Sequence, residues 1–241
     1  MSYIIEMSNV SYAAQNRLLV SDISCQFEEG KITALIGPSG GGKSTVLKLS
    51  AGLFAPDKGK VMFRGMDVHR MSRSENLAFR KESAVVFQDS ALWANQSLFQ
   101  ILELPLRVHF PSMTKPERER RVQSVVADVG YRKDLGVRPS QLSMGEQKLI
   151  AFARALMCDP RLLYLDEMTE SLDERAAQRL NKMVKKLHTD GVTVILVSHD
   201  IRVIRYFADI VIIITGGQIT QILTRDKITD DDDLSRYIEG D

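Results

Sequence analysis

A glycine-rich segment near the start of the chain constrains the fold more than any other feature. Its residues are Gly37, Pro38, Ser39, Gly40, Gly41, Gly42, Lys43, Ser44 and Thr45. The apolar run 32–36 precedes it, and a helix-forming run begins at residue 46. The order strand, glycine loop, helix is the setting in which the pattern G-x-x-x-x-G-K-[ST] binds phosphate. The sequence therefore predicts an α/β fold around a site for a nucleoside triphosphate.

The residue types of this loop match the chemistry of a triphosphate. Glycines lack a Cβ, so consecutive backbone N–H groups can turn inward and form an anion-sized concavity. The N-terminus of the following helix adds a partial positive charge. Lys43 can reach the outer phosphates, and the Ser44 hydroxyl can bind Mg²⁺. The alternative, a glycine-rich turn with an incidental lysine, does not explain the flanking strand and helix.

The length, composition, net charge and cysteine count limit the classes of protein to which the chain can belong. The chain has 241 residues, 44% hydrophobic and 26% charged, which suits one α/β domain with an insertion. A formal net charge of +1 gives no field that attracts nucleic acid, so we expect no nucleic-acid partner. Cys25 and Cys158 are too few for a disulfide framework and indicate a reducing compartment.

Membrane and secretion signals are also missing from the pattern. The N-terminus lacks the basic start and apolar core of a signal peptide. No apolar run approaches the roughly 20 residues that span a bilayer. If the protein acts at a membrane, we therefore expect another chain to supply the membrane part.

The region before the glycine loop predicts an antiparallel β layer. Short apolar runs lie at 4–5, 10–12, 18–20 and 23–27, and the turn-prone Asn9, Asn16 and Asp22 separate them. Tyr12 lies in the second of these runs. Its ring can stack on a nucleotide base or pack as an ordinary strand aromatic, and its position alone leaves both interpretations open.

The segment 97–157 changes character. It contains helical signals and no strand signals. Thr114 and the glutamate three residues later form a capping box, which opens a helix that should end before Gly130. We therefore predict a helical subdomain at about 97–157, inserted between 1–96 and 158–241, which form the β subdomain and the phosphate-loop core.

Polar side chains follow the predicted buried strands. Gln88 comes after the run 84–87, Asp166 and Glu167 after 162–165, and His199 after 192–197. Open α/β sheets place their ligand groups at such strand ends. Beside a phosphate loop, Asp166 can hold Mg²⁺ and Glu167 can polarise a water molecule. The alternatives are an ordinary turn glutamine, two acids that merely end a strand, and a structural histidine.

A second capping-box pattern precedes the helix that runs to about Met157. Ser143 and Glu146 have the required spacing. The same helix N-terminus could instead face a phosphate. The local sequence does not separate these two interpretations.

Taken in this order, the motifs resemble those of the ATP-binding cassette (ABC) ATPases over essentially the whole chain. The resemblance implies the following roles: Tyr12 stacks on adenine, residues 37–45 are the Walker A loop, Gln88 is the Q-loop glutamine, Ser143 and Gly145 belong to the signature motif, Asp166 is the Walker B aspartate, Glu167 is the catalytic glutamate, Ser171, Leu172 and Asp173 form the D-loop, and His199 contacts the γ-phosphate.

The resemblance also implies the cofactors and the assembly. ATP and Mg²⁺ are the expected ligands, with the metal near Ser44, Gln88 and Asp166, the last through water. Lys43, Gln88, Glu167 and His199 would form the catalytic set. A second copy of the chain, or a homologous subunit, would bind head to tail. Ser143 and Gly145 would then contact ATP bound to the partner.

Several positions depart from the family pattern. Met144 and Glu146 replace a glycine and a glutamine of the signature, Met168 stands in place of a proline, and Glu170 in place of a D-loop serine. Met144 adds bulk and Glu146 adds negative charge where the partner's phosphate should bind. We expect these changes to affect the binding of ATP across the dimer more than the chemistry within one subunit.

The resemblance favours a transporter subunit that drives a separate membrane permease from the cytoplasmic face of the membrane. The permease would dock between Gln88 and Leu106. The stretches 86–93 and 104–107 are similar to lipid-transport ATPases of the Mla/MCE type. Two other roles stay open: a soluble ABC protein acting on nucleic acid or ribosomes, and a regulatory module of cell-division type with low turnover. The sequence does not indicate the direction of transport.

Overall fold

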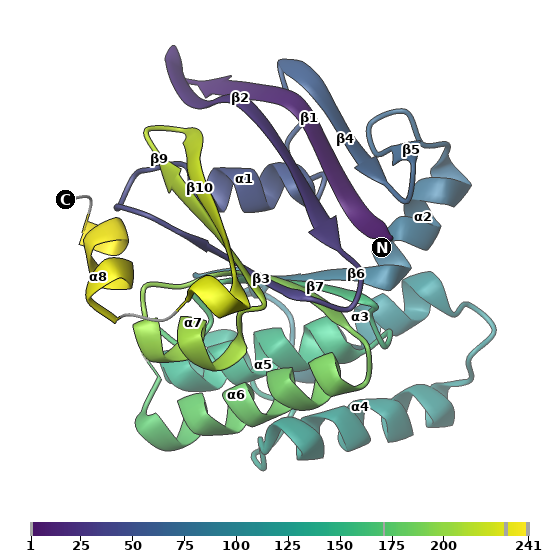
Figure 1. Cartoon of the computed structure of the whole chain (residues 1–241). Helices are drawn as coiled ribbons and strands as arrows, with labels where there is room; N and C mark the ends of the chain where they lie inside the picture. The colour runs from purple at the N-terminus through teal and green to yellow at the C-terminus, as the bar shows by residue number, and fades with distance from the viewer. Residues whose placement is uncertain (1, 171, 229–230, 240–241) are drawn as a thin grey trace.

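The computed structural model describes residues 2–170, 172–228 and 231–239. Figure 1 shows an antiparallel sheet above a central sheet, with α1 (Lys43–Ser50) between them and most other helices beneath. This α/β arrangement with an antiparallel β layer agrees with the fold expected from the sequence. The D-loop residue Ser171 lies outside the described residues.

The antiparallel sheet has the strand order β2-β1-β4-β5. The strands are β1 (Tyr3–Ala14), β2 (Arg17–Glu28), β4 (Lys58–Phe63) and β5 (Met66–Asp67). The expectation of four short strands before residue 28 is wrong, because Asn9 and Asp22 do not end a strand. Both have positive φ, 50° and 51°, at irregularities of the β1–β2 register, and Asn9 Nδ2 donates to Asp22 Oδ1 at 3.0 Å. They bend a continuous hairpin, and only the turn at Asn16 reverses the chain.

The central sheet has the order β10-β9-β3-β8-β7-β6. Its strands are β3 (Ile32–Ile36), β6 (Ser83–Val86), β7 (Leu162–Asp166), β8 (Thr193–Val197), β9 (Ile210–Thr215) and β10 (Gln218–Thr224). All neighbours pair in parallel except β9 and β10, which form a closing hairpin. Every residue of β3, β7 and β8 is buried, as expected for parallel strands covered on both faces. Parallel pairing brings the carboxyl ends of β3, β6, β7 and β8 to one edge.

The segment predicted to be helical contains α3 (Leu98–His109), α4 (Lys115–Val129), the short 3₁₀ turn Pro139–Gln141 and α5 (Met144–Leu156). Thr114 N donates to the Glu117 carboxylate at 2.7 Å, and Gly130 has a φ of 77° after the last turn of α4. The predicted start and end of this helix are therefore confirmed. Arg118 and Glu103 form a largely buried ion pair that joins α4 to α3 at 2.7 Å.

The remaining helices are α2 (Arg73–Glu82), α6 (Glu174–Thr189), α7 (Ile201–Phe207) and α8 (Asp231–Glu239), with a 3₁₀ turn at Arg225–Lys227.

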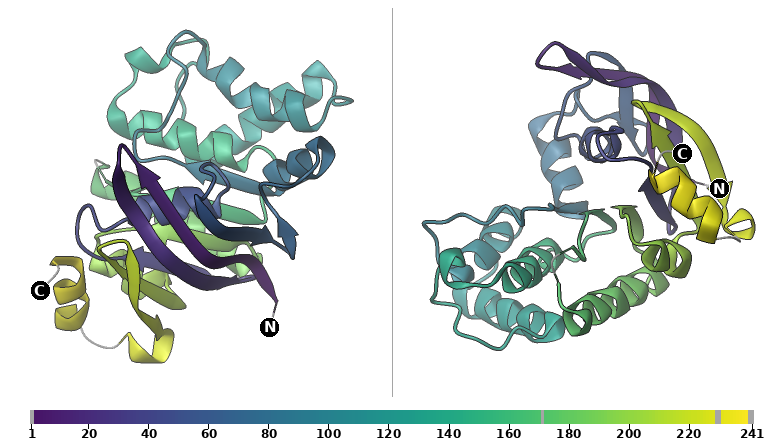
Figure 2. Two further views of the ribbon diagram at one scale, coloured as in Figure 1. Left: turned by 90° about the horizontal axis from the view of Figure 1, so that it is seen from above. Right: turned by 90° about the vertical axis from the view of Figure 1, so that its left-hand side faces the viewer.

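Two hydrophobic cores flank the central sheet. One packs α1 and the antiparallel sheet against it, and the other packs α3 to α7 against the opposite face (Figure 2). Because α3 to α5 share that second core with the sheet, the domain boundaries at about 97 and 157 stay a prediction. Among the described residues, no helix is both long and apolar enough to cross a membrane.

Candidate functional site

The glycine loop joins β3 to α1 and depends on glycine at particular positions. Gly37 has a φ of 138°, and a Cβ there would lie 2.0 Å from the Ile214 carbonyl oxygen. Gly42 has a φ of 102° at the start of α1, and a Cβ would lie 2.8 Å from the Leu19 oxygen. A side chain at either position would clash with the backbone of β2 or β9. The close packing of the loop against these strands therefore requires glycine at both positions.

Lys43 closes over this loop. Its Nζ donates to the carbonyl oxygens of Gly37 at 2.8 Å and Pro38 at 2.7 Å. Burial lowers the pKa of the Lys43 ammonium, while Glu167 and Asp166 act in the opposite direction. The ammonium therefore stays within the loop, where phosphate oxygens can replace the carbonyl partners.

A cavity of about 480 Å³ opens in front of the loop. It is lined by Arg17, Leu19, Ser39, Gly40, Gly42, Lys43, Ser44, Thr45, Gln88, Glu167, Glu170 and His199. The structure thus brings together the loop and three of the strand-end residues that the sequence singles out, from segments far apart in the chain. Asp166 lines the adjoining cleft of about 820 Å³, which also contains Ser44 and Gln88.

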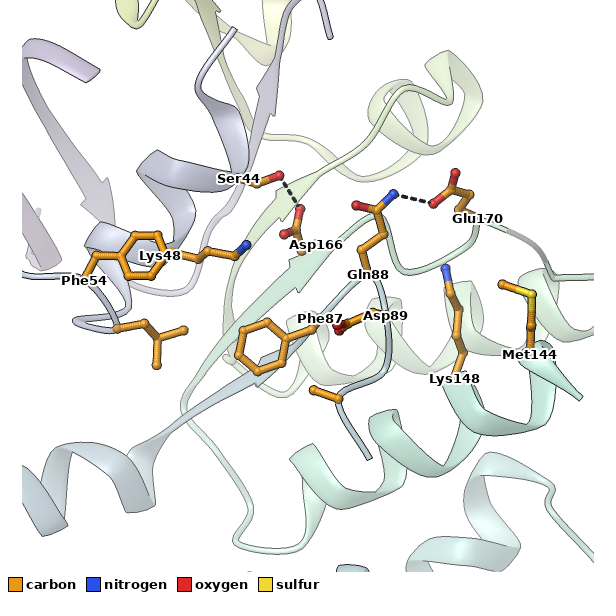
Figure 3. A pocket seen from close by; sticks show the side chains of 12 residues that line it. Ser44, Lys48, Phe54, Phe87, Gln88, Asp89, Met144, Lys148, Asp166 and Glu170 are labelled. Carbon is orange, nitrogen blue, oxygen red and sulfur yellow. Dashed lines mark hydrogen bonds between the residues drawn. The ribbon is translucent and has the colours of Figure 1, made fainter. Parts of the chain in front are cut away.

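The oxygen atoms near the loop fit a magnesium ion. Ser44 Oγ donates to Asp166 Oδ1 at 2.8 Å, and Asp166 is 2% exposed at the end of β7. Figure 3 shows the amide oxygen of Gln88 on the side of these two groups. Hydroxyl, carboxylate and amide oxygens, completed by water and phosphate, are the ligands that Mg²⁺ prefers. Among the described residues, no group of three or more His, Cys, Asp or Glu is placed to hold a metal ion.

Glu167 and His199 form a pair at the tips of β7 and β8. His199 Nε2 lies 2.9 Å from Glu167 Oε1. Burial raises the pKa of Glu167 to about 7, with Asp166 and Glu170 adding to the rise and Lys43 opposing it. Burial also lowers the pKa of His199, as does Lys43. A carboxyl group that takes up a proton near neutral pH is suited to act as a general base.

Gln88 makes a contact that the sequence did not reveal. Its Nε2 donates to Glu170 Oε2 at 2.8 Å (Figure 3). The departure at Glu170 was visible in the sequence, but its partner was not. Lys148, a helix residue whose local pattern does not mark it as functional, donates to the Glu167 carbonyl oxygen at 2.9 Å. Arg17, at the start of β2, lines the phosphate-loop cavity and was missed because nothing in its local pattern distinguishes it from a surface arginine.

Tyr12 lies differently from the other predicted ligands. Its ring stacks on Phe54, with the centroids 5.2 Å apart and the planes 11° from parallel. It is not among the residues that line the phosphate-loop cavity. One face of the ring is thus occupied, and stacking on adenine, which stays a prediction, requires the other face.

The signature segment begins α5, and the capping-box interpretation is confirmed. Ser143 Oγ accepts from Glu146 N at 3.3 Å, and Glu146 Oε2 accepts from Ser143 N at 3.0 Å. Glu146 also pairs with Lys133 at 2.5 Å, which offsets its negative charge. Ser143 and Gly145 do not line the phosphate-loop cavity of their own chain. A role as a phosphate contact therefore requires a second chain and stays a prediction.

Comparison with known proteins identifies relatives. A family model described as "ABC transporter" matches residues 20–170. The phospholipid-transport ATP-binding protein MlaF of Escherichia coli strain K12 is 36% identical over 207 residues, covering 86% of this chain and 77% of MlaF. The nickel-import ATP-binding protein NikE of Shigella flexneri is 33% identical over 231 residues, covering 94% of this chain and 86% of NikE.

A solved structure agrees with the fold. The ATP-binding cassette MJ0796, in a dimeric post-hydrolysis state with ADP and Pi, superposes with a TM-score of 0.85 at 28% identity. The match covers 92% of this chain and 98% of MJ0796. The same fold is therefore present in an ATP-binding cassette whose structure was solved after hydrolysis, with ADP and Pi bound.

The raised pKa of Glu167 predicts a pH-dependent stability. The folded-state pKa of about 7 lies above the unfolded value, so the stabilising contribution is complete below about pH 4.3 and is lost as the pH rises through 7. Glu167→Gln cannot ionise and should therefore gain in melting temperature, relative to the unmodified protein, between pH 5 and pH 8.5. Thermal unfolding without nucleotide or divalent cation measures this difference. The exposed Glu174→Gln is the control, and a difference that stays flat across this range contradicts the prediction.

Proposed function

This chain belongs to the ABC transporter family of ATP-binding subunits, and from that premise we propose how it hydrolyses ATP and what it drives. The observation that carries the proposal is the Glu167–His199 pair, which faces the same cavity as Lys43 and Ser44. A base, a positive charge and a metal-binding hydroxyl therefore converge on one space beside the phosphate loop. We propose a Mg²⁺-dependent ATPase subunit of a lipid transporter with a separate permease.

The proposed reaction is in-line attack of water on the γ-phosphate of ATP. The loop amides and Lys43 stabilise negative charge on the phosphates. Ser44 and Asp166 would hold Mg²⁺, which when bound would neutralise charge that develops there. Glu167 accepts the proton of the attacking water. His199, hydrogen-bonded to Glu167, lies where it can orient that carboxylate and contact the γ-phosphate. Gln88 lies at the opening of the same cavity and can contact the water or the metal.

Substitution of the base tests this assignment. Glu167→Gln keeps the size of the side chain and removes its ability to accept a proton. We expect turnover to fall by about 10²–10⁴-fold while ATP binding persists and the closed dimer accumulates. Phosphate release and size-exclusion chromatography with ATP measure the two effects. Near-normal turnover in the variant would remove Glu167 from its proposed role.

We further propose a head-to-tail dimer in which each signature segment faces the phosphate loop of the partner. MJ0796, the solved relative, is dimeric. Within this chain, the exposed Ser143 and the neighbouring Gly145 lie outside their own phosphate-loop cavity. Met144 is 65% exposed beside them and adds an apolar side chain to the face that the partner would meet. Two-fold symmetry makes the two composite sites equivalent in a homodimer.

Mixing two inactive variants tests this composite site. Lys43→Met disables the phosphate loop, and Ser143→Arg blocks the signature. Each variant alone should be inactive, but a mixed dimer contains one site with both parts intact. We therefore expect the mixture to regain about a quarter of the original activity if the two sites act independently. The Lys43→Met/Ser143→Arg double variant, mixed with either single variant, is the control and should regain none. Failure of the single-variant mixture, despite subunit exchange shown with labelled chains, contradicts the arrangement.

The permease is proposed to dock at the cleft of about 820 Å³ between the phosphate-loop core and α5, in the region from Gln88 to Leu106. Leu53 and Phe87 contribute apolar lining. The guanidinium of Arg154 lies over the ring of Trp93, which is 45% exposed, and donates to the carbonyl oxygen of Ala91, a lining residue of the cleft. Apolar side chains left open around a cleft are typical of a protein-binding surface. This docking would hold the subunit at the cytoplasmic face of the membrane.

The lipid substrate rests on residues 86–93 and 104–107, which resemble lipid-transport ATPases, while relatives for phospholipid and for nickel are similarly close to this chain. An assay with the complete complex separates a lipid substrate from nickel. The full chain is purified with the permease that accompanies it, and the complex is reconstituted in phospholipid vesicles. We expect ATP-dependent transfer of a labelled phospholipid that Glu167→Gln abolishes. Nickel uptake without lipid transfer would overturn the lipid proposal. Binding of ATP with negligible turnover in that complex would favour the regulatory module, and co-purifying ribosomes or nucleic acid the soluble alternative.

A further inference from the structure

Lys148 is a buried cation that the proposed reaction does not use. It is 3% exposed and lies in the second turn of α5, the helix that Ser143 begins. Its Nζ donates to the backbone carbonyl oxygen of Glu167 at 2.9 Å. Removing an ammonium group from water is costly unless it gains partners, so a buried lysine at this position calls for an explanation.

The backbone that Lys148 contacts is strained. Glu167 has a φ of 50°, in the left-handed region that non-glycine residues rarely adopt. Such a conformation costs on the order of 1–3 kcal/mol and persists only where its surroundings hold it. Here three hydrogen bonds do so: Glu167 N donates to Val197 O at 3.1 Å, and Glu167 O accepts from Glu170 N at 3.3 Å and from Lys148 Nζ at 2.9 Å. The first comes from β8 of the core and the second from the turn after β7. The third, from α5, is the only one of the three that a side chain supplies.

The side chain of Glu167 depends on this backbone conformation. The left-handed backbone of Glu167 ends β7 and turns the chain away from the strand axis. The side chain then points to His199, with Glu167 Oε1 2.9 Å from His199 Nε2. If the Glu167 peptide relaxed to an extended conformation, its Cα–Cβ bond would point elsewhere and the pairing with His199 would be lost.

Three carboxylates lie near the Lys148 ammonium, which donates to the Glu167 carbonyl oxygen. The carboxylates of Glu170, Glu167 and Asp166, in that order of influence, favour its charged form against the effect of burial. Figure 3 shows the Lys148 ammonium directed toward the end of the cleft where Gln88 binds Glu170. The lysine therefore reaches from α5 into the group of side chains that surrounds the catalytic base.

We propose that Lys148 is a positioning residue that holds Glu167 in its left-handed conformation and so links the signature helix to the base of its own chain. This inference rests on the proposed function, in which Ser143 at the start of α5 contacts the partner's ATP. One helix then touches both composite sites: its N-terminus faces the partner's nucleotide, and Lys148 holds the glutamate that acts on its own.

Steady-state ATP hydrolysis by the full chain tests this role with Lys148→Met and Lys148→Arg. Methionine has a similar length but no hydrogen-bond donor, whereas arginine keeps the charge and the donor. We expect Lys148→Met to lower kcat by about 10–100-fold, because a small misplacement of a reacting group costs that much, with KM for ATP within about twofold. Lys148→Arg should recover a large part of kcat. The exposed Lys182→Met, on α6, is the control and should behave as the unmodified protein.

A double variant separates positioning from a general loss of structure. In Glu167→Gln the proposed base is already absent, so adding Lys148→Met should lower the residual rate by less than twofold. Three outcomes would overturn the inference. The double variant could lose as much activity relative to Glu167→Gln as Lys148→Met loses relative to the unmodified protein. Lys148→Met could instead keep its kcat, or lose activity only through a higher KM for ATP. If Lys148→Met fails to fold, as judged by thermal unfolding, Lys148→Arg decides instead: an Arg variant whose kcat is as low as that of Glu167→Gln overturns the inference. Normal turnover in Glu167→Gln would instead show that the proposed function itself fails.

Discussion

Parallel pairing of β3, β7 and β8 is the constraint on which the rest of the structure depends. The register pairs Leu35 with Val197 and Leu165 with Leu196, two consecutive residues of β8. The phosphate loop, Asp166 and Ser198 therefore lie at the same edge of the sheet. Every residue in these strands is buried, so a shift of register would expose apolar side chains to water or bury polar ones. The hydrophobic cores on both faces thereby determine the geometry of a polar site at the edge of the sheet.

The site concentrates like charges and then compensates them from several directions. Asp166, Glu167 and Glu170 follow one strand, and two buried lysines, Lys43 from α1 and Lys148 from α5, lie against them. At Glu167, burial together with Asp166 and Glu170 outweighs the two lysines and raises the pKa of the carboxyl group to about 7. Because the two lysines belong to different elements, a movement of α5 relative to the core would change the charge around the base. The electrostatics of the site are thus tied to the position of the signature helix.

Local signals in the sequence predicted the start and end of α4, and failed where the same residue type is found both in turns and in bulges. Thr114 and Gly130 mark the ends of α4 because a cap satisfies backbone groups within a few residues of itself. Asn9 has the same preference for a left-handed backbone as a turn residue, yet it lies in a bulge of the long strand β1. Only pairing with β2 and β4 decides between a turn and a bulge, and that pairing involves residues far away in the chain.

The sequence by itself determined the phosphate loop between a strand and a helix, the ends of α4, and which polar side chains follow the buried strands, among them Glu167 and His199. These features depend on residue type and short spacing. Tertiary structure alone decided that Gln88 binds Glu170, that Tyr12 stacks on Phe54, and that a helix lysine reaches the Glu167 backbone. Such contacts join separate elements, and their energies depend on burial and distance, which no local pattern of residues encodes.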